Sequence, residues 1–509
     1  MTIRMPILVY DFSGGINDRD ADSILNDNES PDMENVVLGR RGTIQTRPGT
    51  VLFRNAFVSS ASPVTSLYEH VDAVGNSYVL AFAGTSLSRA TANNWVVLRT
   101  GFTANTYLFF VSNSIINKSL FVNGIDGYFE TDGMTCNPVV MYTPTTQEQT
   151  NIGQCVFPAN PRLIAYHKYR VWLGNINPSF PDRVYYSVDD INGNTLYNYF
   201  TPTGWLRASN PKGEGLTAMV SFRGRLYLFT ATTIKAISGD DLVNFRMDDY
   251  STDVGTVSAR TVKIIGDYMI FLGHDGVYMC DGNNAPFNIS QRIQNIIRNV
   301  SLNHRHLSAA IVSNGQYYLS IPESTVNDIT LMYDANVIPL TYMGDRHSFA
   351  NSPWVKHRGF VPNDWIVARD LQMYFGANDG YVYQYGISKA DNGREIKAYY
   401  VTKRFDLRAP DRMKRFRNLQ LDVNRSPDSF MRIEYMTDLD DEWKVLREEI
   451  GLNNPRLHAQ MNFPDGKGPL CRKLALRLSS MFSGSEFTIN GLSMDVALRG
   501  QQMKMEGER

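Results

Sequence analysis

The sequence predicts an all-β protein whose central part is a β-propeller of about seven blades, with six to eight accepted. Three observations lead to this prediction. Tyrosine and phenylalanine are abundant, at 27 and 26 of 509 residues, and aromatic side chains favour pleated strands. Helical periodicity is confined mainly to residues 290–300, apart from a short helix or two expected in residues 21–38. The third observation is a unit of strand, turn and strand that recurs along the middle of the chain.

The recurring unit consists of an apolar run, a tight turn and a second apolar run rich in Tyr, Phe and Leu. Its clearest copies begin at Ala218, Val262 and Ala309. A second turn signal, Asp-Gly followed by aromatic or branched residues, occurs at Asp126, Asp275 and Asp379. We expect type I′ turns there, in which both central residues need a positive φ. Each unit is therefore predicted to run strand, turn, strand, Asp-Gly turn, strand.

The spacing of these units favours a propeller over unrelated hairpins in a sandwich or barrel. The second runs are 42 to 56 residues apart, at Tyr78, Leu120, Val171, Leu226, Met269, Tyr317 and Met373. A four-stranded blade with its turns needs about 40–50 residues. We therefore predict a propeller over residues 59–387.

The two ends of the chain lack this repeat. Residues 1–58 are polar and rich in turn residues, and we expect an N-terminal extension that serves assembly. Residues 388–509 contain at least five runs with period-two alternation, as in residues 473–478. Such alternation is typical of strands with one buried face. The sequence therefore predicts a C-terminal β-sandwich.

The composition narrows the class of protein. The formal net charge is −1, which gives no sign of nucleic-acid binding through excess charge. The four cysteines lie far apart without a CxxC pair, so we expect free thiols, not a zinc site or a disulfide framework. No run reaches the roughly 18 apolar residues of a membrane-spanning helix. We therefore expect assembly in a reducing cytoplasm and no membrane-spanning segment.

Signals for catalysis are weak. Residues 187–196 approach the Asp-box of sialidase propellers, but two extra residues separate Asp189 from Gly193, and Leu196 replaces the tryptophan. Adjacent acidic residues on a strand point to opposite faces, so they do not form the carboxylate pair of a glycosidase. We expect no catalytic residue and no enzyme. A glycan-binding or glycan-hydrolysing propeller stays the alternative, and it requires a carboxylate-lined pocket on the propeller axis.

Metal-binding signals are also incomplete. His304 and His306 would share one face of a strand, but no third ligand lies nearby in the sequence. We therefore expect no metal site and no cofactor.

Short motifs near the N-terminus carry a family resemblance. Gly14, Gly15, Ile16 and Asn17 form a turn motif, Asn35 lies in the sequence Glu-Asn-Val-Val, and Arg47, Pro48 and Gly49 follow. In this order they resemble the opening of tail proteins of tailed bacteriophages, known as nozzle, tail tubular B or stabilisation proteins. The resemblance continues weakly through the middle of the chain and returns in the predicted sandwich, at residues 398–423.

The resemblance implies a virion structural protein. Proteins of this family form a ring, expected to be a homohexamer, around the channel for DNA ejection, and other tail proteins such as the adaptor, the tail tube, fibres or spikes are the implied partners. The implied location is the virion tail after assembly in the host cytoplasm; whether the ring is a nozzle or a head-to-tail joining component stays open.

One basic segment is a candidate interface. Its seven cations are Lys403, Arg404, Arg408, Arg412, Lys414, Arg415 and Arg417. They are expected either to form a solvated face or to contact an acidic neighbouring subunit or, transiently, passing DNA.

Overall fold

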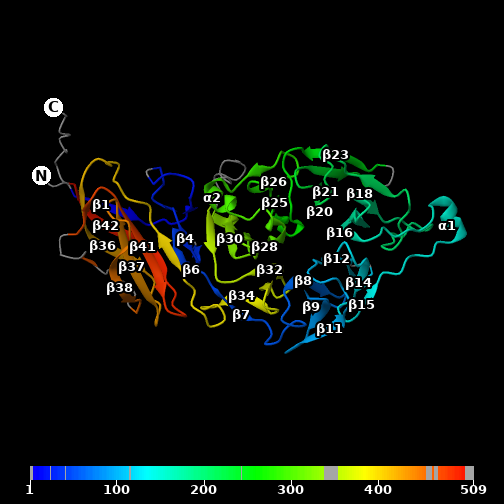
Figure 1. Ribbon diagram of the computed structural model, residues 1–509, viewed down its shortest axis with the longest axis horizontal. Helices are drawn as coiled ribbons and strands as arrows, with labels where there is room; N and C mark the ends of the chain where they lie inside the picture. Colours follow the sequence, from blue (N-terminus) through cyan, green and yellow to red (C-terminus); the bar gives the residue numbers. More distant parts are fainter. Residues whose placement is uncertain are drawn as a thin grey trace.

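The computed structural model confirms the predicted fold class, a β-propeller followed by a β-sandwich (Figure 1). It describes residues 4–498 except 23, 40–41, 114–115, 242–243, 338–352, 454–460 and 463–467. Seven four-stranded antiparallel sheets form the blades. All seven positions used to measure the repeat lie on the second strand of successive blades. The sequence repeat therefore predicted both the spacing of the blades and the strand of each blade on which these positions lie.

The first four blades follow the chain without interruption. Blade 1 contains β8 (Val64–Val71), β9 (Ser77–Ala83), β10 (Ser86–Ala90) and β11 (Trp95–Arg99). Blade 2 contains β12 (Phe109–Asn113), β13 (Lys118–Val122), β14 (Tyr128–Thr131) and β15 (Cys136–Pro138). Blade 3 contains β16 (Pro161–His167), β17 (Arg170–Ile176), β18 (Phe180–Tyr186) and β19 (Trp205–Arg207). Blade 4 contains β20 (Ala218–Phe222), β21 (Arg225–Phe229), β22 (Ile234–Ser238) and β23 (Arg246–Ser251).

The last three blades complete the circle. Blade 5 contains β24 (Lys263–Ile265), β25 (Tyr268–Leu272), β26 (Val277–Cys280) and β27 (Phe287–Asn288). Blade 6 contains β28 (Ala309–Ser313), β29 (Gln316–Ile321), β30 (Ile329–Asp334) and β31 (Trp354–His357). Blade 7 contains β32 (Pro362–Val367), β33 (Met373–Ala377) and β34 (Val382–Ser388), and its outer strand is β7 (Gly49–Leu52). The segment 1–58 thus supplies the strand that closes the propeller.

The sandwich is built from both ends of the chain. One sheet contains β1 (Arg4–Val9), β5 (Val36–Leu38), β6 (Ile44–Thr46), β36 (Lys414–Val423), β39 (Met461–Asn462), β40 (Leu470–Cys471) and β42 (Thr488–Leu498). The other contains β4 (Met33–Glu34), β35 (Tyr399–Val401), β37 (Phe430–Thr437), β38 (Lys444–Gly451) and β41 (Leu474–Met481). A short parallel pair, β2 (Gly15–Ile16) and β3 (Glu29–Ser30), lies outside both sheets.

Helices are few and short. The predicted helical face at 290–300 is present as η3 (Gln291–Ile293) and α2 (Gln294–Arg298), and α1 is Thr146–Asn151. Single 3-10 turns are η2 (Ala259–Thr261), η4 (Arg305–Leu307) and η5 (Ala335–Val337). The expectation of a helix in residues 21–38 is wrong, because the described part of this segment forms β3, β4, β5 and turns. Pro31 disfavours helical backbone at Ser30.

The Asp-Gly turns lie where the repeat placed them, between the second and third strands of blades 2, 5 and 7. The expected type I′ conformation is wrong, since none of the three aspartates has a positive φ. The aspartates accept hydrogen bonds instead. For example, Asp275 and Asp379 each accept one from a tyrosine hydroxyl, Tyr278 at 2.6 Å and Tyr383 at 2.7 Å.

Propeller and sandwich share one hydrophobic core. A single cluster of buried side chains runs from blades 5–7 through residues of the N-terminal segment into both sheets of the sandwich. Phe12 and Tyr400 illustrate the connection, with ring centroids 5.3 Å apart. The two parts therefore form a continuous packed body along the long axis of the molecule (Figure 1).

The propeller axis is bridged by side chains from opposite blades. Tyr107 lies just before blade 2 and Arg260 just before blade 5, yet the guanidinium carbon is 3.7 Å from the ring centroid. Blades 2 and 5 are not neighbours, so this contact crosses the axis. Arg260 also donates hydrogen bonds to the carbonyl oxygens of Asn363 and Leu307. Side chains thus bridge the axis at this point.

Candidate functional site

The Gly-Gly-Ile-Asn motif packs against the outer strand of blade 6. Gly15 has φ +70°, and a Cβ there would lie 2.8 Å from backbone atoms of Trp354. A Cβ on Gly14 would lie 2.6 Å from the carbonyl oxygen of Asn28. Ile16 is buried in the shared core. Because the backbone comes this close to β31 and to the neighbouring turn, Gly14 and Gly15 cannot carry a side chain.

Asn17 extends this contact toward the connection between blades 5 and 6. Its Nδ2 donates to Asp20 at 3.1 Å and to Glu29 at 3.2 Å. The buried Glu29 carboxylate also pairs with Arg292 at 2.7 Å. The motif thus ties the N-terminal segment to η3.

Asn35 connects three separate segments. Its φ is 56°, a left-handed conformation that asparagine tolerates better than most residues. Its Nδ2 donates to the carbonyl oxygen of Lys397 at 3.0 Å, and its Oδ1 accepts from the backbone N–H of Arg358 at 2.8 Å. The same oxygen accepts from Nε of Arg47 at 2.8 Å. One side chain therefore joins the residue that follows β31, the linker and the segment before β7.

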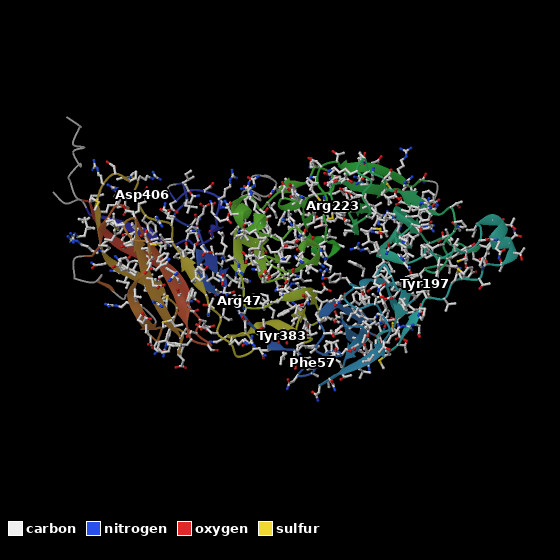
Figure 2. The ribbon with its side chains drawn as sticks, in the orientation of Figure 1. Arg47, Phe57, Tyr197, Arg223, Tyr383 and Asp406 are labelled. Atoms are coloured by element: carbon white, nitrogen blue, oxygen red, sulfur yellow. The ribbon has the colours of Figure 1, made fainter. Side chains whose placement is uncertain are left out.

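Arg47 is fully buried and uses its whole guanidinium. Nη1 and Nη2 donate to the two carboxylate oxygens of Asp391 at 3.0 and 2.5 Å. Nη2 also donates to the carbonyl oxygen of Arg358 at 2.8 Å, and the guanidinium carbon lies 4.7 Å from the ring centroid of Phe360. A planar fork with several donors matches this set of acceptors, whereas lysine would not. Figure 2 shows Arg47 between the propeller and the sandwich.

Pro48 and Gly49 lead from this ion pair into the closing strand. The carbonyl oxygen of Pro48 accepts a hydrogen bond from Arg47 at 3.0 Å. Gly49 begins β7, and a Cβ at this position would lie 2.2 Å from the carbonyl oxygen of Ala390. The motif residues therefore make two sets of contacts along the boundary between propeller and sandwich, one at the start of β31 and one just after its end. We call these residues together the junction: Gly14, Gly15, Ile16, Asn17, Asn35, Arg47, Pro48 and Gly49.

His357 adds a neutral group to the junction. Its Nε2 is 3.0 Å from the carbonyl oxygen of Val36. Burial lowers the pKa of His357 to about 3, and the charge of Arg47 acts in the same direction. The imidazole is therefore uncharged at neutral pH, and the buried charges of Arg47 and Asp391 are left to balance each other.

The basic segment does not form one surface. Lys403 pairs with Asp27 at 2.5 Å and donates to the carbonyl oxygen of Leu25. Arg404 lies 3.4 Å from Asp22. Lys414 is buried, and its ammonium donates to three backbone carbonyl oxygens, those of Ala409, Arg412 and Arg472. Arg415 donates to the carbonyl oxygen of Gly468 at 3.4 Å. The three cations whose side chains are exposed are Arg408, Arg412 and Arg417.

The other sequence signals are not assembled into a reactive site. His304 and His306 lie at the start of and within η4, not on a strand, and their Nδ1 atoms face Ser301 and the carbonyl oxygen of Asn303. Residues 187–196 form a turn, with Asp189 bound to Arg170 at 2.7 Å. Within the described residues, no group of three or more His, Cys, Asp or Glu side chains is placed to hold a metal ion. The four cysteines are free thiols.

A small cavity of about 220 Å³ lies beside the junction, between blade 7 and the linker. Its carboxylates are Asp379 and Asp391, and both already have partners. Asp391 is held by Arg47, and Asp379 accepts hydrogen bonds from Tyr383 and from the N–H of Tyr381.

Sequence reasoning missed the partners of the motif residues. Asp391, Arg358, Phe360 and Lys397 complete the junction, but they lie more than 300 residues from Asn35 and Arg47. The one local signal is the Asp-Asn-Gly sequence at 391–393, which predicts only a turn.

The geometry thus defines a class: a seven-bladed propeller joined to a β-sandwich through a buried polar junction. No protein-family model matches the sequence, and no curated protein matches it. Among solved structures, the chain is similar to the extracellular domain described as a hybrid two component system, BT4673, of B. thetaiotaomicron. That pair has a TM-score of 0.43 at 11% identity, over 86% of this chain and 61% of the other.

A second similar structure is the WD40 β propeller domain of Doa1, with a TM-score of 0.38 at 14% identity, over 67% of this chain and 98% of that domain. The chain spans about three fifths of the length of the BT4673 domain. Both likenesses concern the fold alone.

Among the helices of the described residues, none is long and apolar enough to cross a membrane.

Proposed function

We propose that this protein is a structural subunit of a bacteriophage tail, and that several copies form a ring around the channel through which DNA leaves the particle. The observation that carries the proposal is the junction. Residues named by a resemblance of short motifs all contact the boundary between propeller and sandwich. Asn35 and Arg47 do so through hydrogen bonds, and Gly14, Gly15 and Gly49 through close approach of the backbone. Motif matches that arise by chance have no reason to fall along one boundary of the fold.

The side-chain contact across the propeller axis supports a channel between copies. The contact of Tyr107 with Arg260 crosses the axis, so the propeller itself offers no passage for a DNA duplex. A net charge of −1 also suits a wall past which DNA slides, since many phosphate contacts would retain it. A ring of copies related by rotation supplies such a wall.

The proposed role is structural, without catalysis. Hydrolysis of a glycoside needs two carboxyl groups that are free to give and take protons at the bond. In the cavity beside blade 7, Asp391 is engaged by Arg47 and Asp379 by Tyr383. This arrangement suits two fixed acceptors better than an acid and a base, and it does not favour the glycan-hydrolysing alternative.

The remaining details of the proposal follow from the resemblance. Six copies would form the ring, as a nozzle or as a head-to-tail joining component in the virion tail after assembly in the host cytoplasm. The partners would be the adaptor or tail tube and fibres or spikes, and contact with DNA would be transient.

Quantitative mass spectrometry of purified particles tests the proposal. We expect this chain in every particle preparation, at a fixed ratio to the other tail proteins that corresponds to one ring. Glycan turnover by the purified protein provides the counter-test, with Asp379→Asn as the variant that removes a cavity carboxylate. Absence from particles, or turnover that Asp379→Asn abolishes, would contradict the proposal.

A further inference from the structure

A groove lies at the end of the sandwich that is remote from the propeller. Its volume is about 550 Å³, and it is lined by β1, by residues 24–27 and by residues 403–408. Asp406, which lines it, is labelled at this end of the molecule in Figure 2. The floor contains the buried side chains of Ile7, Leu25 and Phe405. The groove therefore has an apolar base.

The groove combines exposed apolar side chains with the charged residues Asp27, Lys403, Asp406 and Arg408. Leu8 is 52% exposed and Ile24 is 68% exposed. Tyr10, which follows β1, is 60% exposed. Adjacent exposed apolar side chains of this size usually mark a contact site.

One wall of the groove is an open strand edge. Among the described residues, β1 pairs with β42 alone, from Arg4 opposite Ala497 to Val9 opposite Leu492. The groove is lined by β1 and by no residue of β42, so it adjoins the side of β1 without a partner strand. Natural proteins cover such an edge or protect it with charges. Residues 6–9, Pro-Ile-Leu-Val, carry no charge themselves, and the charges at the groove belong to the segments that face β1.

Residues 499–509 have a sequence that suits this groove. They read RGQQMKMEGER, and Met503 and Met505 alternate with Lys504 and Glu506. In an extended strand, the two methionines would share one face and the two charges the other. Eleven extended residues span up to about 36 Å, which is more than the length of β1.

The place where these residues begin decides which copy they can reach. Leu498 ends β42 beside the start of β1, on the side of β1 opposite the groove. To enter the groove of its own copy, the chain would have to turn back and cross β1, whereas entry into the groove of a second copy requires no such crossing.

We propose that residues 499–509 of one copy bind in the groove beside β1 of the next copy, as an added strand with its methionines on Ile7, Leu25 and Phe405. The proposal rests on the proposed function, because it names a contact that would hold neighbouring subunits of the ring. Addition of a strand to an open edge gives affinity through the backbone and specificity through alternate side chains.

The first test uses a fluorescein-labelled peptide of residues 499–509 and the chain ending at Leu498, with fluorescence anisotropy as the readout. We expect saturable binding that Leu8→Arg or Ile24→Glu weakens at least tenfold. Ile125→Glu is the matched control, since Ile125 is 47% exposed on the propeller and should leave binding unchanged. A Met503→Glu peptide should bind at least tenfold more weakly than a Lys504→Gln peptide, which keeps the test independent of protein folding. No binding, or equal binding by all variants, would overturn the proposal.

The second test asks whether the contact joins two copies. The chain ending at Leu498 keeps the groove and lacks the segment, whereas the full chain with Leu8→Arg and Ile24→Glu keeps the segment and lacks the groove. We expect these two proteins to associate in a pull-down with different tags, and neither to associate with itself. Peptide binding without association would overturn the contact between copies. The groove contact and the tail role can fail separately, because a peptide that binds to a protein absent from particles contradicts only the proposed function.

Discussion

Arg47 and Asp391 form a buried two-point ion pair across 344 residues of sequence, with Nη1 to Oδ1 at 3.0 Å and Nη2 to Oδ2 at 2.5 Å. The pair lies where the closing strand of blade 7 meets the linker to the sandwich. The same two residues therefore fix how the propeller closes and how the sandwich is attached.

Arg47→Ala should destabilise the protein strongly. Removal of one partner leaves the Asp391 carboxylate buried without its counter-charge, at a cost of about 3–5 kcal/mol. Urea unfolding followed by tryptophan fluorescence measures the loss. Arg223→Ala is the control, because the pair of Arg223 and Asp267 is exposed and such pairs contribute at most about 1 kcal/mol. Equal losses in the two variants would mean that the ion pair does not hold the junction.

Asn35→Ala should lower the free energy of unfolding by more than the strain of a left-handed alanine explains. Asn35 and Asn314 both have left-handed φ, 56° and 50°, so alanine adds about 1 kcal/mol of strain at either position. Only Asn35 also joins Arg47, Arg358 and Lys397 through its side chain. We expect Asn35→Ala to lower the free energy of unfolding by at least about 2 kcal/mol more than Asn314→Ala. A difference near zero would show that these hydrogen bonds add nothing.

Gly49→Ala should prevent β7 from pairing normally with β34. The added methyl group would lie 2.2 Å from the carbonyl oxygen of Ala390, so the strand or the linker must move, at a cost of about 1–3 kcal/mol. Gly451→Ala serves as the control, since its nearest neighbouring atom would be 3.7 Å away. Hydrogen exchange should show faster exchange in β34, the partner of β7, in Gly49→Ala alone. Unchanged protection of β34 would contradict the role of β7 as the closing strand.

Stability should fall as the pH drops below about 6.5. Burial lowers the pKa of His167 from its ordinary value of 6.5 to about 4, and Lys168 adds to this effect while Asp240 opposes it. Burial lowers the pKa of His357 to about 3. Because the unfolded chain binds these protons at a higher pH than the folded protein does, the histidine contribution to the free energy of unfolding is full above pH 6.5. It is lost as the pH falls from 6.5 through about 4 for His167 and about 3 for His357.

Urea unfolding at pH 7.5 and pH 5 checks this pH dependence. His167→Gln should lose part of the difference between the two pH values, because it has no imidazole to protonate. His274→Gln is the control, since that side chain is exposed. If His167→Gln keeps the full pH dependence, the buried histidine is not its source.

The propeller could be predicted because each blade carries its own signals. The second strand of every blade is an apolar run after a tight turn, as at Leu226 and Tyr317, so the period is visible without knowledge of tertiary contacts. The closing strand was not predictable, because Gly49–Leu52 pairs with Val382–Ser388 and nothing local in either segment identifies the other.

The junction was predictable only in part for the same reason. The resemblance pointed to Asn35 and Arg47, but their partner Asp391 lies in a linker that looks like an ordinary turn. The basic segment was predicted as one cluster, whereas Lys414 is buried against backbone carbonyl oxygens. The sequence does not show which backbone carbonyl oxygens accept hydrogen bonds from a lysine. A prediction from charge alone therefore overestimates how much of such a segment is exposed.

Cryo-electron microscopy of the intact particle shows whether this protein forms a ring in the tail. We expect a ring of rotationally related copies around the DNA channel, each with density for a seven-bladed propeller joined to a sandwich at Arg47 and Asp391. Particles whose tail contains no such density, in a preparation where every other tail protein is located, would contradict this expectation.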